Sequence, residues 1–281
     1  MSTIDFDLHD RVVIVAGAGG GGIGTAVMRR VAQAGATVIA VNRTLEHMVE
    51  YADELIAEGR QVYPVTADVS TEPGIAKVMQ RAADARGELY GLVNVAGGAA
   101  PETWMPAIRV SRQDWRDLFT ANLETMFFMS QAVAAELRGS SRPGSIVSVS
   151  SISGMNTAPF HIGYGAAKAA IVAVTRTLAL ELASDGVRVN AVAPGVTATA
   201  ASGAYVDVDE VRDRQAIAMG RRGTPEEQAD AIVFLLSGLS SYVTGQTLLV
   251  DGGLDLRWTH VGADNTSVFL KDESFRAAIT H

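Results

Sequence analysis

The sequence predicts a single α/β domain, a doubly wound parallel sheet of about seven strands with helices on both faces. Seven short apolar runs alternate with segments of helical character along nearly the whole chain, the pattern of successive β-α-β units. A glycine cluster follows the first apolar run, where such sheets bind phosphate groups. The 281 residues, 48% of them hydrophobic, suffice for one large domain and are few for two.

The expected strands are short and rich in Val, Ile, Leu and Ala, which indicates burial on both faces of the sheet. They cover residues 12–16, 37–41, 62–66, 89–95, 145–151, 187–192 and 247–250. The expected helices between them cover residues 25–34, 44–59, 70–86, 111–137, 164–184 and 224–237.

Capping signals support several of these helices. Ser70 is an expected N-cap, and Ser111 with Asp114 has the spacing of a capping box. Residues 224–227 combine a Thr cap, a Pro in the first position and a Glu that completes a second box. Gly59 is expected at the C-terminal end of the second helix.

The region after the sixth strand differs from the rest. Residues 197–223 have no clear strand pattern, and a long irregular stretch in a compact domain is usually functional. We therefore expect a substrate lid there, within a domain that spans residues 1–253. The tail, residues 254–281, is expected to pack on this domain or on a partner subunit.

The composition excludes several classes of function. The absence of Cys excludes disulfides, thiolate catalysis and cysteine-ligated metals. The net charge of −8 argues against a nucleic-acid partner. Residues 1–10 lack the features of a signal peptide, and no apolar run reaches the ~18 residues of a membrane span. A cytoplasmic protein without a membrane contact is expected, and no His or acid stands near His161 at metal-ligand spacing, so no metal is expected.

Three side chains between residues 151 and 168 have the chemistry of proton transfer. Tyr164 and Lys168 are four residues apart, so a helix places them on one face, one turn apart. Ser151 is the last residue of the fifth expected strand. A hydroxyl, a phenol and an ammonium can therefore meet where that strand ends and the helix passes, which suits proton transfer to or from a carbonyl oxygen.

The glycine cluster lies between the first strand and the first helix, which is the context of a nucleotide phosphate site. Glycines leave room for a pyrophosphate, and amide groups at the helix start face it. The expected contacts are Gly17, Gly19, Gly22, Ile23 and Gly24. Without the flanking strand and helix, a flexible turn would explain such a cluster equally well.

The end of the second strand indicates which nucleotide binds. An acidic residue there recognises a free ribose 2′-hydroxyl, whereas an Arg accommodates a 2′-phosphate. This chain has Asn42 and Arg43, with no carboxylate until Glu46. NADP(H) is therefore favoured, and NAD(H) stays possible.

Further polar and apolar residues surround the expected site. Asn122 stands among apolar residues of a long helix, where it must find partners; it either ties backbone segments together or holds a water. Four residues are candidates for the substrate wall, although core packing would explain each as well: Trp104, Met155, Phe160 and His161.

Together these residues resemble the short-chain dehydrogenase/reductase family, in its single-domain branch with a Rossmann-type sheet. The resemblance covers residues 10–253 and rests on elements in the family's order: Gly22-Ile23-Gly24, Asp68, Asn94-Val95-Ala96-Gly97, Asn122, Ser151, Tyr164 with Lys168, Pro194-Gly195 with Thr199, and Asp251-Gly252-Gly253. There are departures: Ala16 stands where Thr is usual, Val95 replaces an Asn, and the glycine turn is one residue longer.

The resemblance implies roles for these residues. Tyr164 is the general acid–base group, Lys168 lowers the pKa of Tyr164 and holds the ribose, Ser151 binds the substrate oxygen, and Asn122 keeps a water against Lys168. The cofactor contacts that it implies, beyond the glycines, Asn42 and Arg43, are Asp68, Val69, Asn94, Ala96, Gly97, Tyr164, Lys168, Pro194, Gly195, Thr197 and Thr199.

The expected activity is hydride transfer between NADP(H) and a ketone or secondary alcohol, and several alternatives stay open. The family includes 3-oxoacyl-carrier-protein reductases, which grip an acidic carrier with basic residues; Arg142 suits that role and Asp185 does not. An NAD(H)-preferring alcohol dehydrogenase, a nucleotide-binding regulator without chemistry, and an epimerase or dehydratase are the others. The family also implies a homodimer or homotetramer through residues 111–137 and 163–184, with an apolar run at Leu123, Met126, Phe127, Met129 and Val133.

Overall fold

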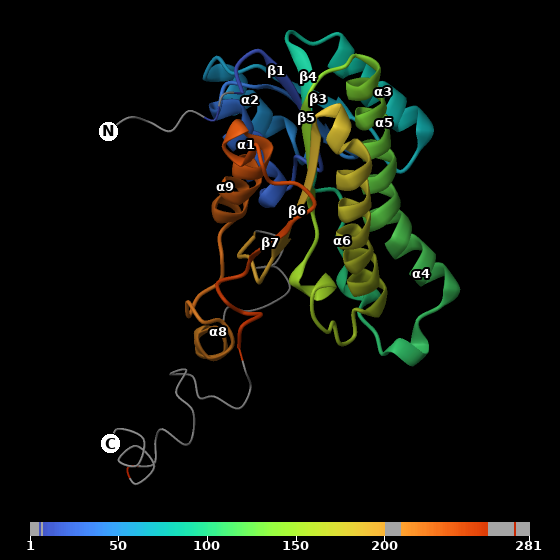
Figure 1. The fold of residues 1–281 in the computed structure, drawn as a ribbon. Coiled ribbons are helices and arrows are strands. Elements are labelled where there is room, and N and C mark those ends of the chain that lie inside the picture. The colour runs from blue at the N-terminus through green and yellow to red at the C-terminus, as the bar shows by residue number, and fades with distance from the viewer. Residues whose placement is uncertain (1–5, 7, 200–208, 258–272, 274–281) are drawn as a thin grey trace.

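The computed structural model describes residues 6, 8–199, 209–257 and 273. All seven expected strands form and pair in parallel in the order β3-β2-β1-β4-β5-β6-β7 (Figure 1). The strands are β1 Arg11–Ala16, β2 Thr37–Asn42, β3 Val62–Thr66, β4 Glu88–Asn94, β5 Gly144–Val149, β6 Val187–Pro194 and β7 Thr247–Val250. The doubly wound parallel sheet is therefore confirmed.

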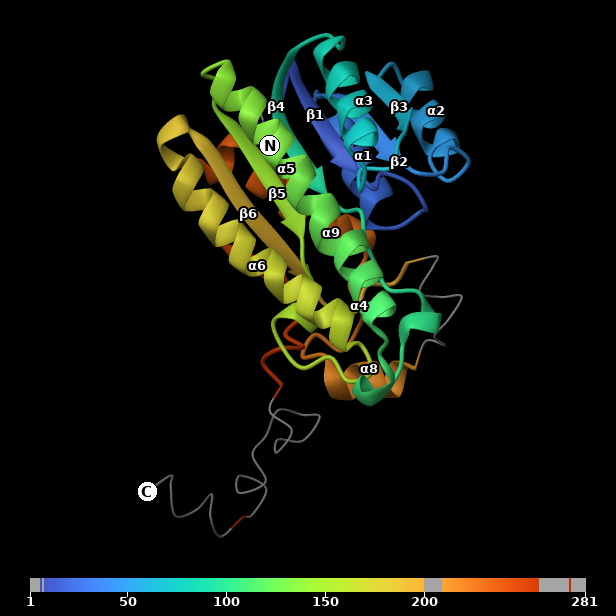
Figure 2. The same cartoon turned by 90° about the vertical axis from the view of Figure 1, so that its right-hand side faces the viewer.

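Helices cover both faces of the sheet (Figures 1 and 2). One layer consists of α1 (Ile23–Gln33), α2 (Val49–Ala57) and α9 (Pro225–Leu236). The other consists of α3 (Glu72–Ala83), α5 (Thr125–Gly139) and α6 (Ile162–Leu182). Two shorter helices are α4 (Arg112–Phe119) and α8 (Glu210–Ala216).

The alternation of side chains along the strands divides the core in two. In β1, Val13 and Val15 pack with the layer of α1 and α9, while Val12 and Ile14 pack with that of α3, α5 and α6. All four are fully buried, because successive residues of a strand point to opposite faces and both faces are covered.

The strand order reverses at the neighbouring pair β1 and β4, where the chain returns from β3 to the centre of the sheet. Ligands of such sheets bind outside the carboxyl ends of the strands at this position. The backbones meet closely here: the amides of Val95 and Ala96 both donate to the carbonyl of Ala16, at 2.8 Å each. The glycine loop and the Asn94–Gly98 segment therefore border one crevice.

Two helix starts differ from the expected ones. Helix α2 begins at Val49 rather than at residue 44, because the preceding residues form a turn whose carbonyl at His47 accepts the amide of Gly20 (2.7 Å). The N-cap of α3 is Thr71 rather than Ser70. Ser70 instead donates its hydroxyl and its amide to the carboxylate of Asp68, at 2.7 and 2.9 Å.

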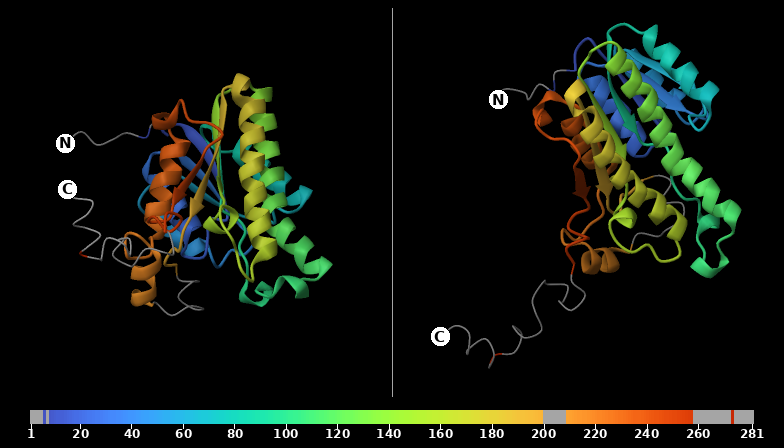
Figure 3. Two further views of the ribbon diagram at one scale, coloured as in Figure 1. Left: turned by 60° about the horizontal axis from the view of Figure 1, so that its bottom comes forward. Right: turned by 45° about the vertical axis from the view of Figure 1, so that its right-hand side comes forward.

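The long helix expected at 111–137 forms, with a local irregularity. The capping box of Ser111 and Asp114 is present, but a π-helical turn at Thr120–Glu124 separates α4 from α5. The two helices still follow one line past the sheet (Figure 3). A π-turn in a helix often marks a functional site, and this one contains Asn122.

The apolar run expected at a subunit interface is mostly internal. Met126, Met129 and Val133 are buried against the sheet, and the exposed aromatic residue on this helix is Phe128. The interpretation of that run as an interface is therefore wrong for these three residues. None of the described helices combines the length and the apolarity needed to cross a bilayer.

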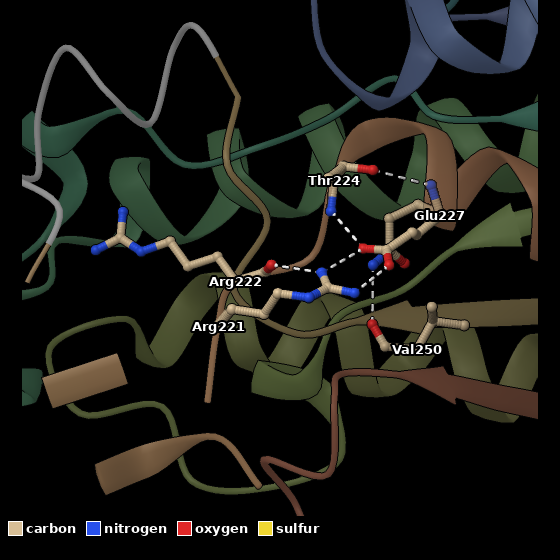
Figure 4. Close-up of polar contacts among 6 residues, drawn as sticks. Arg221, Arg222, Thr224, Glu227 and Val250 are labelled. Atoms are coloured by element: carbon tan, nitrogen blue, oxygen red, sulfur yellow. Dashed lines mark hydrogen bonds and ion pairs between the residues drawn. The ribbon is translucent and has the colours of Figure 1, made fainter. Parts of the chain in front are cut away.

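The start of α9 is anchored by the end of the expected lid segment (Figure 4). Arg221 binds both carboxylate oxygens of Glu227, at 2.9 and 2.6 Å, and Glu227 accepts the amide of Thr224 at 2.8 Å. These bonds lower the pKa of Glu227 to about 2. Next to it, the side-chain amide of Gln228 donates to the carbonyl of Val250 (2.9 Å), which joins α9 to β7.

Candidate active site

Ser151, Tyr164 and Lys168 meet at the carboxyl end of β5. Helix α6 places Tyr164 and Lys168 one turn apart, and the Lys168 Nζ atom lies 5.6 Å from the centre of the Tyr164 ring. Ser151 follows β5 and caps a short 3-10 turn at Ile152–Gly154, with its hydroxyl accepting the amide of Ser153 (3.1 Å). Gly154 lets this turn approach α6, because a Cβ there would lie 2.5 Å from the carbonyl carbon of Lys168.

Lys168 is held by β5 through both its side chain and its backbone. Its ammonium donates to the carbonyl of Val149 (2.9 Å), and its own carbonyl accepts the hydroxyl of Ser150 (2.8 Å). The side chain is 3% exposed. Burial lowers the pKa of Lys168 to about 8, because the charged form is poorly solvated there. The sequence analysis did not identify Ser150 as a residue that holds Lys168. The closely spaced serines of the run Ser148-Val149-Ser150-Ser151 could have indicated it.

Tyr164 is partly buried, and its environment acts on its pKa in two directions. Burial raises the pKa of the phenol, and a hydrogen bond with Ser151 lowers it by less. That Lys168, together with an oxidised nicotinamide, lowers the pKa of Tyr164 stays a prediction. A phenol that keeps its proton is suited to act as an acid.

Asn122 is fully buried and uses its side chain to hold the segment after β4. Its carbonyl oxygen accepts the amide of Gly98 (2.8 Å), and its amide nitrogen donates to the carbonyls of Gly98 (2.9 Å) and Leu118 (3.0 Å). Gly97 is required beside it, because a Cβ there would lie 2.6 Å from the Asn122 oxygen. Of its two expected roles, the structure displays the tie between backbone segments.

The glycine loop has the shape of a phosphate cradle. A Cβ on Gly17 would lie 2.5 Å from the amide nitrogen of Ala96, and one on Gly24 would lie 1.8 Å from the carbonyl oxygen of Gly17. Helix α1 starts after Gly22, and no side chain caps it. Its first amide groups therefore face the cradle without a side-chain partner, as an anion site requires.

The extra residue of the loop is accommodated by Gly20 and Gly21, whose φ angles of 87° and 66° are both left-handed. The amide of Gly20 donates to the carbonyl of His47 (2.7 Å), and that of Gly21 to the hydroxyl of Thr25 (3.0 Å). Thr25 in turn donates to the carbonyl of Ala18 (3.2 Å). Sequence reasoning missed Thr25 and His47, since nothing in the glycine pattern marks them.

The expected ribose site lies beside this loop. The side-chain oxygen of Asn42 accepts the amide of Arg43 (2.8 Å), and its nitrogen would be 2.3 Å from a Cβ on Gly19. The guanidinium of Arg43 is exposed. Asp68 is also exposed, and its pKa is lowered by hydrogen bonds from Ser70 and, less, by Arg43. Asn42, Arg43 and Asp68 therefore surround the same end of the crevice.

The remaining expected cofactor contacts differ in where their side chains lie. Thr199 reaches the glycine loop, with its methyl group 3.6 Å from the position of a Cβ on Gly22. Thr197 pairs with Gly223 in an isolated parallel bridge. Asn94 turns inward, and its amide donates to the hydroxyls of Ser130 (2.9 Å) and Ser148 (3.2 Å). Val69 and Pro194 are buried, and Ala96 and Gly195 lie at strand ends.

The crevice fits a dinucleotide. Gly17 and Gly24 carry no side chain where the loop meets the segment after β4 and the start of α1, and the uncapped start of α1 offers donors to a phosphate. Lys168 and the exposed Arg43 add positive charge at two further points. A nicotinamide dinucleotide, which the family implies, would therefore find hydrogen-bond donors for its phosphate groups. The glycines would let its pyrophosphate approach the protein backbone closely.

One wall of the crevice combines the segment after β4 with the start of α6. The rings of Trp104 and His161 lie 3.7 Å apart, and those of His161 and Tyr164 lie 5.8 Å apart. The amide of Met105 donates to the carbonyl of Phe160 (2.9 Å). Phe160 is 61% exposed and Met155 40%. Of the four expected substrate residues, His161 thus adjoins the tyrosine, and Trp104 adjoins His161.

Only part of the expected lid belongs to the described residues. Its two ends are joined by the bridge of Thr197 with Gly223, and its second half contains α8 and a buried ion pair between Arg222 and Asp213 (2.7 Å). The middle of the lid (200–208) and nearly all of the tail, including Trp258, Phe269 and Phe275, lie outside the described residues.

Comparison with known proteins identifies the family. Residues 17–255 match the family model described as enoyl-(acyl carrier protein) reductase. The chain is 38% identical to an uncharacterized oxidoreductase of Mycobacterium tuberculosis over 251 residues, covering 89% of this chain and 94% of that protein. It is 36% identical to a 3-oxoacyl-[acyl-carrier-protein] reductase of Thermotoga maritima over 247 residues, covering 88% and 98%.

Solved structures agree with this result. A gluconate 5-dehydrogenase from Burkholderia cenocepacia, in complex with NADP and tartrate, is similar with a TM-score of 0.82 and 29% identity, covering 90% of this chain and 98% of that chain. The overall fold of this chain, with its seven-stranded parallel sheet, agrees with that structure. The chain belongs to the family of that model, among the short-chain dehydrogenases/reductases, and is an oxidoreductase that acts on CH–OH or C=O groups.

Proposed function

We propose that this protein interconverts a ketone and a secondary alcohol with NADP(H), and that Tyr164 is its general acid–base group. The observation that carries the proposal is the convergence of Ser151, Tyr164 and Lys168 at the end of β5, next to the glycine loop. A bound nicotinamide supplies or accepts the hydride in this chemistry. The chain supplies the proton, the position and the electrostatic field.

Each of the four polar residues has a role in this proposal. Tyr164 donates its proton to the carbonyl oxygen in reduction and takes it back in oxidation. The hydroxyl of Ser151 donates a hydrogen bond to the same oxygen, where negative charge develops. Lys168 in its charged form holds the ribose and stabilises the phenolate. Asn122 keeps the Gly97–Gly98 segment in place and is a candidate to position a water near Lys168.

The cofactor preference rests on Arg43. Its exposed guanidinium follows β2, where a 2′-phosphate would lie, and the similar gluconate 5-dehydrogenase was solved with NADP. Replacing Arg43 with Ala is expected to raise the KM for NADPH by about 10–100-fold, because a charge-assisted bond contributes about 1.5–3 kcal/mol, and to leave the KM for NADH unchanged. Steady-state kinetics with both cofactors measures this effect.

A matched control and an opposing result make this experiment decisive. Arg60→Ala removes another exposed arginine, which precedes β3 and so lies at the opposite end of the strands from Arg43, and should change neither KM. Equal changes for NADPH and NADH in Arg43→Ala would contradict 2′-phosphate recognition and favour the NAD(H)-preferring alternative.

The pH dependence of reduction follows from Lys168. Its pKa of about 8 means that it is charged below that pH and neutral above it, while the raised pKa of Tyr164 keeps the phenol protonated over the same range. The kcat/KM for NADPH, which reports ionisations of the free enzyme, should therefore be level below pH 8 and fall above it.

Lys168→Arg provides the control for this profile, because a guanidinium stays charged throughout. The fall above pH 8 should disappear in this variant, even where the overall rate is lower. A wild-type profile that stays level to pH 10 would show that the charge of Lys168 is not required.

The substrate is proposed to be a free ketone or alcohol rather than a carrier-bound thioester. The wall residues Trp104, Phe160 and Met155 are largely apolar and at least 40% exposed, as the lining of a site for a free ketone would be. The basic residue that would grip an acidic carrier, Arg142, is already paired with Glu136 (3.2 Å). Asp185 is paired with Arg138 (3.3 Å), so this region is close to neutral.

The proposal includes the organisation of the domain and its assembly. Residues 1–253 form the dinucleotide-binding domain, residues 197–223 form the lid, and the tail contacts this domain or a partner. Pairing of α5 and α6 between two copies would cover exposed apolar residues such as Phe128 and Leu180, which are 43% and 83% exposed. Such pairing gives a homodimer or a homotetramer.

The experiment that tests the proposal is a titration with NADPH and NADH, followed by a panel of ketones and an acetoacetyl thioester. Oxidation of NADPH with a ketone in the panel supports the dehydrogenase. Turnover of the thioester alone favours the carrier-dependent alternative. Binding of the nucleotide without turnover of any carbonyl would favour the regulator.

A further inference from the structure

The imidazole of His161 has an unusual environment. His161 precedes α6 as its N-cap residue, yet its side chain makes no capping bond. Its Nε2 atom is buried and has no hydrogen-bond partner among the described residues. An unpaired buried polar atom is destabilising, and such atoms in native structures call for an explanation.

The unpaired nitrogen belongs to a ring next to the proposed acid–base group. His161 and Tyr164 are three residues apart, so they lie on the same face of the helix start, and their ring centres are 5.8 Å apart. The indole of Trp104 covers the imidazole edge-on, at 3.7 Å between ring centres. Trp104 itself is 50% exposed, so solvent adjoins this cover.

The backbone holds this arrangement in a strained form. Phe160, immediately before His161, has a φ of 63°, which is unfavourable for a bulky side chain. Its carbonyl accepts the amide of Met105 (2.9 Å), which ties the Trp104 segment to the start of α6. Local strain of this kind persists where the surroundings enforce it, and it often accompanies a ligand site.

The charge state of His161 limits what it can bind. Burial lowers the pKa of His161, so the ring is neutral near neutral pH. A neutral imidazole carries one donor and one acceptor nitrogen and no net charge. It suits a hydroxyl group, which can both accept and donate a hydrogen bond, better than an anion.

We propose that His161 is a specificity-determining residue whose Nε2 atom binds a second oxygen of the substrate, a hydroxyl on a carbon next to the reacting carbonyl, when the indole of Trp104 turns aside. The inference deepens the proposed function and rests on it. The substrate class is then an α-hydroxyketone and the corresponding vicinal diol. In reduction the carbonyl carbon gains the hydride and its oxygen gains the proton of Tyr164, while the second hydroxyl is unchanged.

The test compares two substrates of nearly equal size, hydroxyacetone and butanone, with saturating NADPH. The wild-type enzyme should prefer hydroxyacetone. His161→Leu should lower kcat/KM for hydroxyacetone by about 10–100-fold, the equivalent of one lost hydrogen bond at a buried site, and should change kcat/KM for butanone by less than about threefold. His161→Gln, which keeps an amide nitrogen in a similar position, should restore much of the preference.

Every other result counts against the inference. An equal fall for both ketones would indicate that His161 supports only the structure of the site. No fall for either, or a wild-type preference for butanone, would exclude the second contact. NADPH binding and the melting temperature of each variant serve as controls for folding. A wild-type enzyme that binds NADPH and reduces neither these nor any other carbonyl would instead overturn the proposed function, and the inference with it.

Discussion

Replacing Tyr164 with Phe is expected to lower kcat for carbonyl reduction by about 10²–10⁴-fold, the usual contribution of a general acid–base group. The change removes only the hydroxyl, which lies next to Ser151 and near Lys168. The ring stays, so the packing against His161 is kept. Binding of NADPH should therefore be unchanged, and single-turnover kinetics with titration of NADPH fluorescence measures both quantities.

The control for this variant is Tyr242→Phe, which removes a hydroxyl from a fully exposed tyrosine before β7. Its kcat should equal that of the wild type. A Tyr164→Phe enzyme whose kcat falls by only a few-fold would remove Tyr164 from the proposed mechanism, and would leave Ser151 as the remaining group at the substrate oxygen.

Replacing Gly24 with Ala is expected to destabilise the protein by about 1–3 kcal/mol, as overpacking of a core usually does. The new methyl group would lie 1.8 Å from the carbonyl oxygen of Gly17, and backbone atoms at such a contact can separate only if the glycine loop moves away from α1. Chemical denaturation measures the change. Gly139→Ala makes the same substitution at the end of α5, where a Cβ meets no atom within 4 Å, and should be neutral.

Gly22→Ala separates the binding role of the loop from its packing role. Its methyl group would meet only Thr199, at the ordinary contact distance of 3.6 Å, so the fold should be kept. It would, however, occupy the cradle before α1, and the Kd for NADPH should rise by about tenfold or more, which corresponds to at least about 1.4 kcal/mol. An unchanged Kd would contradict the placement of the cofactor phosphates at this loop.

Local signals in the sequence predicted the elements of the fold well. The capping boxes at Ser111 and Thr224 form as their spacing predicts. The error at the start of α3 has a local cause, because Ser70 donates to the carboxylate of Asp68, two residues earlier. The error at the start of α2 has a tertiary cause, because the carbonyl of His47 accepts an amide from the glycine loop. Long-range partners of this kind leave no periodic pattern in the sequence.

The site was predicted less completely than the fold. The positions of Ser151, Tyr164 and Lys168 follow from a strand end and the helical spacing of four, because local geometry orients those side chains. The burial that raises the pKa of Tyr164 and lowers that of Lys168 does not follow. It depends on how the loop after β5 folds against α6, and that contact joins segments without a shared pattern.

The amino-acid sequence alone therefore determined the order of strands and helices, the position of the glycine loop and the residues proposed for proton transfer, since these depend on residue type and on spacing within one element. Only the tertiary structure decided that Asn94 turns into the core, that Asn122 secures Gly98, and that Trp104 covers an unpaired nitrogen of His161. Those outcomes depend on which side chains lie within hydrogen-bonding distance after the sheet and its helices have packed. Each polar group can have several possible partners, and only the packed fold decides which partner it contacts.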